Sequence, residues 1–478
     1  MMPTATAIAS IVVIGSLDLL TIGHALLTKR DPRAAWGWIA VCALFPLAGV
    51  VLYWLFGVNR VQTRARRLGI KSSRDLASGV SEPRQSEDEA MAGRLPPNLR
   101  ALAHTGAGLT GLPLLAGNRV EPLHNGEAAY PRMLAAIDGA QDSIALATYI
   151  FDTDETGQSF IDALSRAAQR GVRVRCLVDG LGERYSWPGA SALLKKAGVP
   201  VARFNPLRVF PPSLQMNLRN HRKLLLIDGA LAFTGGMNIS HRHCLADVDN
   251  PGRVRDLHFL IEGPVIDPLQ RAFAEDWRYA TGEVWGFPLP AGPGGGRSIC
   301  RAITDGPNED LDHLRLMLLA AINAAQRRVA IMTPYFLPTV DLITALQAAA
   351  LRGVDTCVVL PELGDSRIAR WAAEHIYAPL LERGVEIQLQ PPPFAHTKLL
   401  LIDDDYAQIG SANLDSRSLR LNFELNIEAY DASLCAQLAA HFEQTRANAR
   451  AVGPSDLAAR GLGVNLRSAI CWLFSPYL

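Results

Sequence analysis

The chain has 478 residues, a formal net charge of +1 and 49% hydrophobic residues. This length provides for two or three domains with well-packed cores. A charge so near zero excludes the strongly basic field of a dedicated nucleic-acid-binding protein. The seven cysteines are scattered and none forms a Cys-x-x-Cys pair. We therefore expect reduced thiols in a cytosol-facing protein rather than a disulfide framework or a thiolate zinc site.

Two apolar segments begin the chain, at residues 5–27 and 36–57, and the second contains no charged residue. Each reaches the roughly 20 apolar residues that cross a bilayer as a helix. Tryptophans near both ends of the second segment suit a membrane interface, and Pro46 suits a kink in a lipid-embedded helix. The start of the chain lacks Lys and Arg and no good cleavage site follows, which disfavours a signal peptide. Residues 1–60 are predicted to form a two-helix transmembrane hairpin.

Basic residues around this hairpin predict its orientation. Three lie between the segments and six follow the second: Lys29, Arg30 and Arg33, then Arg60, Arg64, Arg66, Arg67, Lys71 and Arg74. The positive-inside rule therefore places the large remainder of the chain in the cytoplasm, with a basic run against anionic headgroups. Residues 61–117 are polar and then rich in Gly and Leu, and they predict a basic juxtamembrane segment and linker.

From about residue 118 the chain repeats itself. The stretch LAAIDGAQDSIALATYIF (134–151) resembles LAAINAAQRRVAIMTPYF (319–336), and each copy ends in a basic-apolar strand, HRKLLLID or HTKLLLID. Between these landmarks, helix-like stretches alternate with short apolar runs, which predicts α/β units whose sheet is covered on both faces. We predict two tandem domains, over 118–285 and 299–478, joined by a Gly- and Pro-rich linker at 286–298.

Each copy carries the motif H-x-K-x4-D: His221, Lys223 and Asp228, then His396, Lys398 and Asp403. In a strand, His and Lys two residues apart share one face, whereas the Asp falls on the other face or at the turn. Small residues and an asparagine follow each motif, and the asparagines are Asn238 and Asn413. We interpret Lys and Asn as donors to the oxygens of a phosphate, with the glycines allowing close approach of a ligand.

Two such histidines fit phosphodiester exchange through a covalent intermediate. One neutral imidazole attacks phosphorus, and a second, protonated imidazole gives a proton to the departing alkoxide and then serves as base for the acceptor. The lysines and asparagines stabilise the charge that metal ions stabilise elsewhere, so no metal or cofactor is expected. Because one copy supplies one histidine, the copies are predicted to meet in a single pseudo-twofold core. A duplication that only adds stability is disfavoured by two intact motifs.

These features make the sequence resemble the phospholipase D superfamily and, within it, the bacterial cardiolipin synthases. The resemblance rests on the hairpin turn TKRDPRAAWGWI, both motifs, RDLHFLIEGPVI, SANLDSRSLRLNFELN and the terminal LFSPYL. It implies two phospholipase D-like α/β/α domains. It also implies transfer of a phosphatidyl group between two phosphatidylglycerol molecules through a phosphohistidine, giving cardiolipin and glycerol.

The resemblance also implies roles for individual residues. An acid downstream of each motif, Asp256 in the first copy and Glu424 in the second, orients its histidine. Ser411 matches a hydroxyl of the phosphate site. Asp228 and Asp403 support the motifs structurally rather than react.

The superfamily's usual assignment makes His221 the nucleophile and His396 the acid and base, whereas the residues alone leave this order open. The chain departs from many cardiolipin synthases after Asn238. There the loop at 240–254, SHRHCLADVDNPGRV, replaces a Gly-Asp-Glu-Tyr-like stretch and could border the acceptor pocket. Three potential ligands in it lie too close together, without a second pair, to indicate a metal site: His241, His243 and Cys244.

The implied substrate stays in the bilayer. The expected partners are therefore membrane phospholipids (phosphatidylglycerol and cardiolipin) and the bilayer itself, in a bacterial inner membrane, and not nucleic acid. The apolar stretches 206–217 and 471–478 fit either the membrane interface or ordinary packing. Two enzymatic alternatives use the same site: phospholipase D-type hydrolysis, and transfer to another alcohol such as serine or ethanolamine. The near-neutral charge disfavours a nuclease, and the intact motifs disfavour an inactive scaffold.

Overall fold

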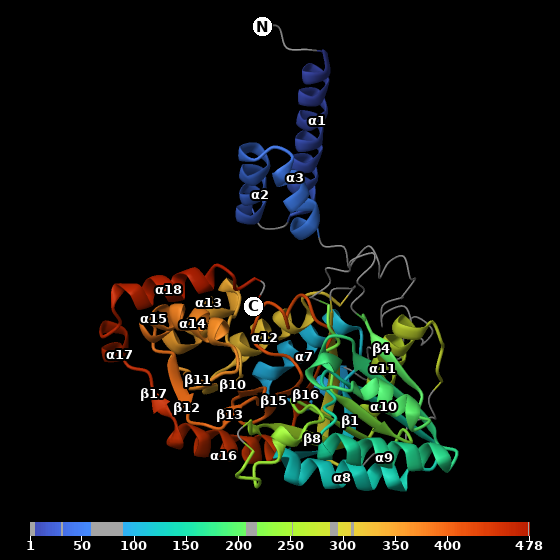
Figure 1. Ribbon diagram of the computed structural model, residues 1–478. Coiled ribbons are helices and arrows are strands. Elements are labelled where there is room, and N and C mark those ends of the chain that lie inside the picture. Colours follow the sequence, from blue (N-terminus) through green and yellow to red (C-terminus); the bar gives the residue numbers. More distant parts are fainter. Residues whose placement is uncertain are drawn as a thin grey trace. The chain divides into compact units, whose positions relative to one another are not determined.

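The computed structural model describes residues 5–29, 32–58, 89–206, 218–250, 252–286, 295–306, 310–476 and 478 (Figure 1). The chain divides into two compact units, Met1–Gly69 and Ile70–Leu478. The basic run predicted after the hairpin, at residues 60–74, and nearly all of the apolar stretch 206–217 lie outside the described residues.

The N-terminal unit contains α1 (Ala5–Thr28), α2 (Pro32–Leu44), α3 (Ala48–Leu52) and the π-helix η1 (Tyr53–Gly57). The sequence predicted one helix over residues 36–57 with a kink at Pro46; the structure instead ends one helix at Leu44 and begins another at Ala48. Proline lacks an amide hydrogen and its ring collides with the preceding turn. Leu47 then has a φ of 67°. Among the described residues, no helix meets the length and apolarity required of a membrane span.

Polar side chains of α1 meet partners on the segment after this break. The Nδ1 atom of His24 lies 2.7 Å from the hydroxyl of Tyr53, and the Trp54 indole donates to Thr21 Oγ1 at 3.2 Å. A Cβ on Gly49 would lie 2.6 Å from the Cα of Cys42, so glycine lets α3 pack directly against α2. The described N-terminal unit is thus a helical hairpin whose second arm folds back on itself.

Among its described residues, the C-terminal unit is built on a 15-stranded sheet. Its strands from the first copy are β1 (Leu115–His124), β2 (Ser143–Thr148), β3 (Arg173–Asp179), β4 (Val201–Phe204), β5 (Leu224–Ile227), β6 (Leu231–Gly235) and β8 (Leu257–Glu262). Those from the second are β9 (Ser298–Asp305), β10 (Arg328–Met332), β11 (Asp355–Pro361), β12 (Glu386–Gln390), β14 (Leu399–Ile402), β15 (Tyr406–Gly410), β16 (Glu424–Tyr430) and β17 (Arg450–Ala451). A separate parallel pair joins β7 (Val254–Arg255) to β13 (Phe394–Ala395).

Strand order repeats in the two halves of this sheet. The first half runs β1-β8-β6-β5-β2-β3-β4 and the second runs β9-β16-β15-β14-β10-β11-β12, with the edge strand β17 beyond. The halves join where β1 pairs with β9 in antiparallel fashion. This mirrored order confirms the predicted pair of tandem α/β domains, and it brings equivalent strands of the two copies to equivalent distances from the junction.

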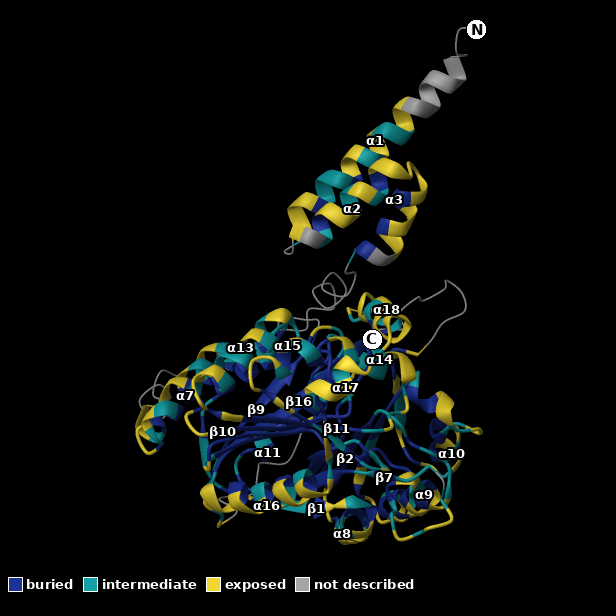
Figure 2. Ribbon diagram, turned by 90° about the vertical axis from the view of Figure 1, so that its left-hand side faces the viewer, coloured by how far each residue is buried: buried dark blue, intermediate teal, exposed yellow. Residues whose placement is uncertain are grey.

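Helices lie on both faces of the sheet (Figure 1). In the first copy they are α8 (Asn125–Gly139), α9 (Glu155–Gln169), η2 (Gly182–Tyr185), α10 (Ala190–Lys196), η3 (His241–His243) and α11 (Ile266–Thr281). In the second they are α12 (His313–Ala324), α13 (Val340–Leu351), α14 (Arg367–His375), α15 (Tyr377–Leu381), α16 (Ala432–Asn448), α17 (Pro454–Ala458) and α18 (Leu462–Trp472). The central strands of the sheet between them are buried (Figure 2).

Burial explains the composition of the central strands. Both β5 and β14 read Leu-Leu-Leu-Ile and are buried throughout, as expected for strands covered on both faces. Leu226 of β5 and Leu401 of β14 belong to one continuous core cluster, so the two copies share a hydrophobic interior. Part of the predicted linker also joins a core: α7 (Pro97–Thr110) buries Leu99 and Leu102 in the cluster of the second copy.

Backbone hydrogen bonds hold each motif segment against the opposite copy. The amide of His396 donates to the carbonyl of Arg255 at 2.7 Å, and the amide of His221 donates to the carbonyl of Phe423 at 2.9 Å. Arg255 and Phe423 directly precede the two predicted orienting acids. Each histidine is therefore fixed beside an acid from the other half of the sheet.

Candidate active site

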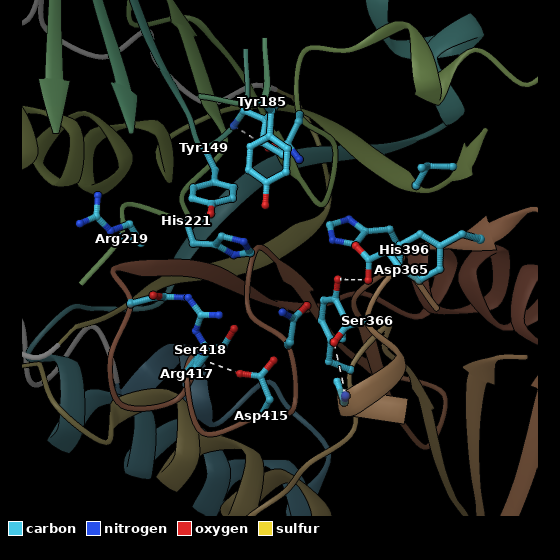
Figure 3. Close-up of a pocket in the computed structure, with 18 of the residues that line it drawn as sticks. Tyr149, Tyr185, Arg219, His221, Asp365, Ser366, His396, Asp415, Arg417 and Ser418 are labelled. Atoms are coloured by element: carbon cyan, nitrogen blue, oxygen red, sulfur yellow. Dashed lines mark hydrogen bonds between the residues drawn. The ribbon is translucent and has the colours of Figure 1, made fainter. Parts of the chain in front are cut away.

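A cavity of about 380 Å³ opens where the two copies meet, and both predicted catalytic histidines line it. Figure 3 shows the rings of His221 and His396 entering this pocket from opposite sides. Their side chains are 13% and 12% exposed, so both imidazoles are accessible only through the cavity. Other lining residues come from both copies: Tyr149, Asn238, Arg242, His243, Tyr335, Asp365, Asn413, Asp415, Arg417 and Ser418.

The acids that contact the histidines are crossed between the copies. Nδ1 of His221 lies 3.2 Å from Oε1 of Glu424, and Nδ1 of His396 lies 3.0 Å from Oδ2 of Asp256 in a hydrogen bond. Both carboxylates are fully buried. The resemblance implied an acid orienting the histidine of its own copy, and this pairing is wrong. The reason is short pairing between the copies outside the main sheet: β7, just before Asp256, pairs with β13, just before His396, and Asn220, just before His221, pairs with Phe423, just before Glu424.

The two acids have different neighbours at matching positions. Ser411 is fully buried and its hydroxyl donates to Glu424 at 2.5 Å, so it does not line the cavity as the predicted phosphate-site hydroxyl would. At the equivalent position, a Cβ on Gly236 would lie 2.4 Å from Oδ1 of Asp256. This glycine makes room for the carboxylate rather than for a ligand, which corrects the expectation from sequence.

The pKa values of the two acids, Asp256 and Glu424, differ as well. Burial raises the pKa of Asp256 to about 7, against the opposing effect of Lys398. Burial acts on Glu424 in the same direction, but His221, Lys223 and the Ser411 hydroxyl together hold its pKa below the usual value. Glu424 is therefore a carboxylate at neutral pH, whereas Asp256 retains a proton over part of that range.

Both imidazoles favour the neutral form in the ligand-free pocket. Burial and then Lys223 lower the pKa of His221, and burial and then Lys398 hold the pKa of His396 well below its usual value. The lysines themselves are buried, which lowers the pKa of Lys223 to about 7 and that of Lys398 to about 8. An anion bound between them would restore their charge.

The motif lysines lie directly beside the histidines. Lys223 donates to the carbonyl of His221 at 2.8 Å. Lys398 donates to the carbonyl of His396 at 2.7 Å, and its Nζ lies 3.0 Å from Nδ1 of the same ring. His and Lys thus lie together in each copy, although they precede β5 and β14 instead of lying within a strand as predicted.

Asp228 and Asp403, the last members of the predicted catalytic motifs, do not line the cavity. The carboxylate of Asp228 accepts from the backbone amides of residues 141, 142 and 143, each at 2.8 Å. Asp403 accepts from the amides of residues 326 to 328 and from the side chain of Asn98 at 3.0 Å. Both clamp the start of the neighbouring strand, at hairpin turns where their φ angles are 50° and 52°.

The two predicted phosphate-binding asparagines line the cavity. Oδ1 of Asn238 accepts from the amide of Ile150 at 3.1 Å, an arrangement that leaves the side-chain NH₂ as its donor group. Asn413 is 4% exposed, and its Oδ1 has no hydrogen-bond partner among the described residues. Both therefore hold amide groups at the wall of the pocket.

Sequence reasoning missed several residues of this wall. The ring of Tyr149 lies 4.9 Å from that of His221, and the hydroxyl of Tyr335 donates to Asp365 at 2.5 Å. Asp415 and Arg417 also line the cavity, and burial raises the pKa of Asp415 to about 6. Asp415 and Arg417 could have been found from the segment SANLDSRS, because they closely follow the predicted site residue Asn413. The two tyrosines follow the repeated strands, where no motif indicates a functional residue.

Comparison with known proteins agrees with this architecture. A family model described as "Cardiolipin synthase, PLD-like domain" matches residues 133–277 and 318–446, and one described as "Phospholipase_D-nuclease N-terminal" matches residues 10–57. Among solved structures, the phosphatidylserine synthase of Haemophilus influenzae covers 79% of this chain and 100% of its own, with a TM-score of 0.61 and 15% identity. At that identity the likeness concerns the fold alone.

Curated relatives match over nearly their whole length. A cardiolipin synthase of Geobacillus kaustophilus is 33% identical over 95% of this chain and 90% of its own. Cardiolipin synthase A of Pseudomonas putida is 34% identical over 97% of this chain and 96% of its own. The chain therefore belongs to the cardiolipin synthase family of the phospholipase D superfamily.

Proposed function

We propose that this enzyme is a phosphatidyltransferase that joins two phosphatidylglycerol molecules into cardiolipin and glycerol. The main support for this proposal is the pair of buried histidines that face one cavity, each beside a carboxylate from the opposite copy. Two imidazoles on opposite sides of a phosphodiester suit an in-line displacement in two steps. The cardiolipin synthases among its relatives supply the substrate class.

In the first step, a ring nitrogen of His221 attacks phosphorus and the bond from phosphorus to the headgroup glycerol oxygen breaks. His396 gives its proton to that oxygen, so glycerol leaves as a neutral alcohol. In the second step, a hydroxyl of another phosphatidylglycerol gives its proton to His396. The resulting oxygen attacks phosphorus, and the phosphorus–nitrogen bond to His221 breaks to regenerate the free imidazole.

The unequal carboxylates support this division of roles. The ionised Glu424 lies 3.2 Å from Nδ1 of His221 and favours a proton on that nitrogen, which leaves the other ring nitrogen with a free lone pair for attack. Asp256, with a pKa of about 7, allows its pair with His396 to hold and release a proton near neutral pH. We therefore assign His221 as nucleophile and His396 as acid and base.

Lys223, Lys398, Asn238 and Asn413 are proposed to bind the non-bridging phosphate oxygens. The cations and amide donors of these side chains match the charge that grows on those oxygens as the phosphorus centre reacts. The lysines are almost fully buried, so their interaction with a bound anion is little screened by solvent. Asp228 and Asp403 are proposed to act only by fixing the strands that carry the site.

Membrane phospholipids are the proposed partners. Exposed apolar side chains crowd the C-terminal segment, where no acidic residue occurs after residue 460: Leu462, Leu466, Ile470, Leu473 and Phe474 (Figure 2). This segment packs on α14, and Ala369 of α14 lines the cavity together with Leu478. An apolar surface without acids beside the cavity suits the anionic bilayer that holds both substrates.

We further propose that the apolar N-terminal unit anchors the enzyme in a bacterial inner membrane as a multi-pass hairpin. The family model that matches residues 10–57 and the apolar composition of both arms support this anchor. The basic residues that follow the hairpin support a cytoplasmic catalytic part. We propose domain boundaries at 118–285 and 299–478, with 1–60 as the membrane hairpin, 61–117 as the segment after it and 286–298 as the linker.

Product analysis tests the proposal. The purified full chain in phosphatidylglycerol vesicles should form cardiolipin and free glycerol in equal amounts. His396→Ala serves as the matched inactive control in the same vesicles. Phosphatidic acid as the main product would identify a hydrolase instead, and the absence of any lipid product would contradict the proposed transfer.

A further inference from the structure

His243 is a third histidine at the wall of the catalytic cavity. It is 3% exposed and ends η3, inside the loop where this sequence departs from the pattern of the family it resembles. Its Nδ1 atom is buried and has no hydrogen-bond partner among the described residues. A buried polar atom without a partner is destabilising. In a ligand cavity, a substrate group can supply the missing partner.

The surroundings of His243 place it on the His396 side of the cavity. Its ring makes a hydrogen bond with the backbone of Val254. Val254 pairs with Phe394 in the small parallel sheet, two residues before His396. The ring is therefore held by the strand that also fixes the backbone of His396, whose amide donates to the residue after Val254.

The protonation state of His243 suits binding to an alcohol. Burial, followed by the effects of His258 and Arg242, lowers the pKa of His243 to about 3, so the ring is neutral at physiological pH. A neutral imidazole that donates from one nitrogen to a backbone carbonyl has an acceptor on the other. Nδ1 is then an acceptor for a hydroxyl group and offers no charge to a phosphate.

The second copy carries a different group at the matching position. Ser418 lies five residues after Asn413, as His243 lies five residues after Asn238. Ser418 also lines the cavity, and its Oγ has no hydrogen-bond partner among the described residues. The duplicated fold thus presents an imidazole near His396 and a hydroxyl at the equivalent place near His221.

We propose that His243 binds the glycerol headgroup in an alcohol subsite beside His396, by accepting a hydrogen bond from the hydroxyl next to the reacting one. This inference rests on the proposed function, in which His221 attacks phosphorus. In-line displacement then puts the leaving and entering alcohols opposite His221, beside His396. One subsite therefore serves both the departing glycerol and the headgroup of the acceptor, and His243 selects for a vicinal diol in both steps.

Two assays on the full-length enzyme in mixed micelles test this role of His243. In the first, a phosphatidyl-p-nitrophenol donor reports attack by His221, because p-nitrophenolate departs without an acid and without a diol. In the second, 1,2-propanediol and 1-propanol compete as acceptors for the phosphatidyl-enzyme. The wild-type enzyme should prefer the diol. His243→Ala should reduce this preference about fivefold to tenfold, the effect of one lost hydrogen bond, and leave p-nitrophenol release within about twofold.

Matched variants distinguish a loss of diol recognition from a general loss of activity or folding. Ser418→Ala should keep the wild-type preference for the diol, since it alters the equivalent position near His221. His243→Asn retains a hydrogen-bond acceptor and should restore part of the preference for the diol. If the alanine variant does not fold, the diol preference of His243→Asn tests the role of His243 instead. Equal losses in both assays, or an unchanged diol preference in folded variants, would overturn the role of His243. Failure of the wild-type enzyme to make cardiolipin would instead overturn the proposed function.

Discussion

The two half-sites have the same backbone but different acids. In one, His221 contacts Glu424, which accepts a hydrogen bond from the hydroxyl of Ser411; in the other, His396 contacts Asp256, which has Gly236 at the position equivalent to Ser411. His221, Lys223 and then the Ser411 hydroxyl hold the pKa of Glu424 below its usual value, whereas burial raises that of Asp256 to about 7. We propose that this difference directs one imidazole to attack and the other to carry a proton.

Crossing of the acids also makes the two copies interdependent. Neither copy contains a complete histidine–carboxylate pair, because the orienting acid of each histidine arises from the other half of the sheet. The shared core around Leu226 and Leu401 holds these partners in register. Variants can therefore test the proposed difference between the half-sites, because each should affect either attack by His221 or proton transfer by His396 and spare the other step.

Removal of either histidine should have the largest effect. We expect His221→Ala and His396→Ala each to lower cardiolipin formation by about a thousandfold or more, because each removes a group that forms a bond in the reaction. With the phosphatidyl-p-nitrophenol donor, His396→Ala should keep a burst of p-nitrophenol, whereas His221→Ala should show none. A burst that survives in His221→Ala but not in His396→Ala would reverse the assigned roles.

The crossed acids should give the next largest effect. Glu424→Gln and Asp256→Asn should each lower cardiolipin formation by about a hundredfold, through loss of histidine orientation and proton affinity. Stopped-flow release of p-nitrophenol separates them. Glu424→Gln should slow the burst, because it acts on His221 across the copies, while Asp256→Asn should spare it. The opposite pattern would contradict the crossed pairing.

Much of this architecture was predictable from sequence, and the crossing was not. The repeated motifs predicted the tandem α/β domains, and the rule of two residues per strand period placed Lys223 with His221. The acids are far from their partners in the chain, and short pairings between the copies, β7 with β13 and Asn220 with Phe423, decide which histidine each acid meets. Ser411 shows the same limit, because its hydroxyl turns into the protein toward Glu424 rather than into the cavity.

Pro46 illustrates a second limit of sequence reasoning. The sequence predicted one helix through residues 36–57 with a kink at Pro46, but it did not show that the proline would end the helix and reverse the chain. The structure instead folds α3 back against α2. By contrast, the buried runs of β5 and β14 were predicted as strands, since both apolar composition and motif spacing pointed to them.

Gly236→Ala tests the space beside Asp256. The new Cβ would overlap the carboxylate, so we expect Asp256 to shift and cardiolipin formation to fall about thirtyfold, with p-nitrophenol release less affected. Gly139→Ala is the matched control, because a Cβ there meets nothing within 4 Å. Equal activity in the two alanine variants would show that the position of Asp256 is not limiting.

The buried lysines predict a dependence of anion binding on pH. Lys223 and Lys398 have pKa values of about 7 and about 8, so their charge is complete below these values and is lost as pH rises through them. Inorganic phosphate, used as a competitive inhibitor at constant ionic strength, should therefore bind about tenfold more weakly at pH 9 than at pH 7. An inhibition constant that stays level across this range would show that the lysines keep their charge in the free enzyme.

Ser411→Ala should have the smallest effect, about fivefold on cardiolipin formation at neutral pH, since it removes one hydrogen bond to a charged group. The hydroxyl of Ser411 lowers the pKa of Glu424, so its removal should raise that pKa. Glu424 orients His221 as a carboxylate, and this form is lost as pH falls through its pKa. The acid limb of the rate profile should consequently move to higher pH in Ser411→Ala, and p-nitrophenol release should follow it. An acid limb that does not move would mean that the hydroxyl only fills space, and that the length of the acid, rather than its partner, distinguishes the two half-sites.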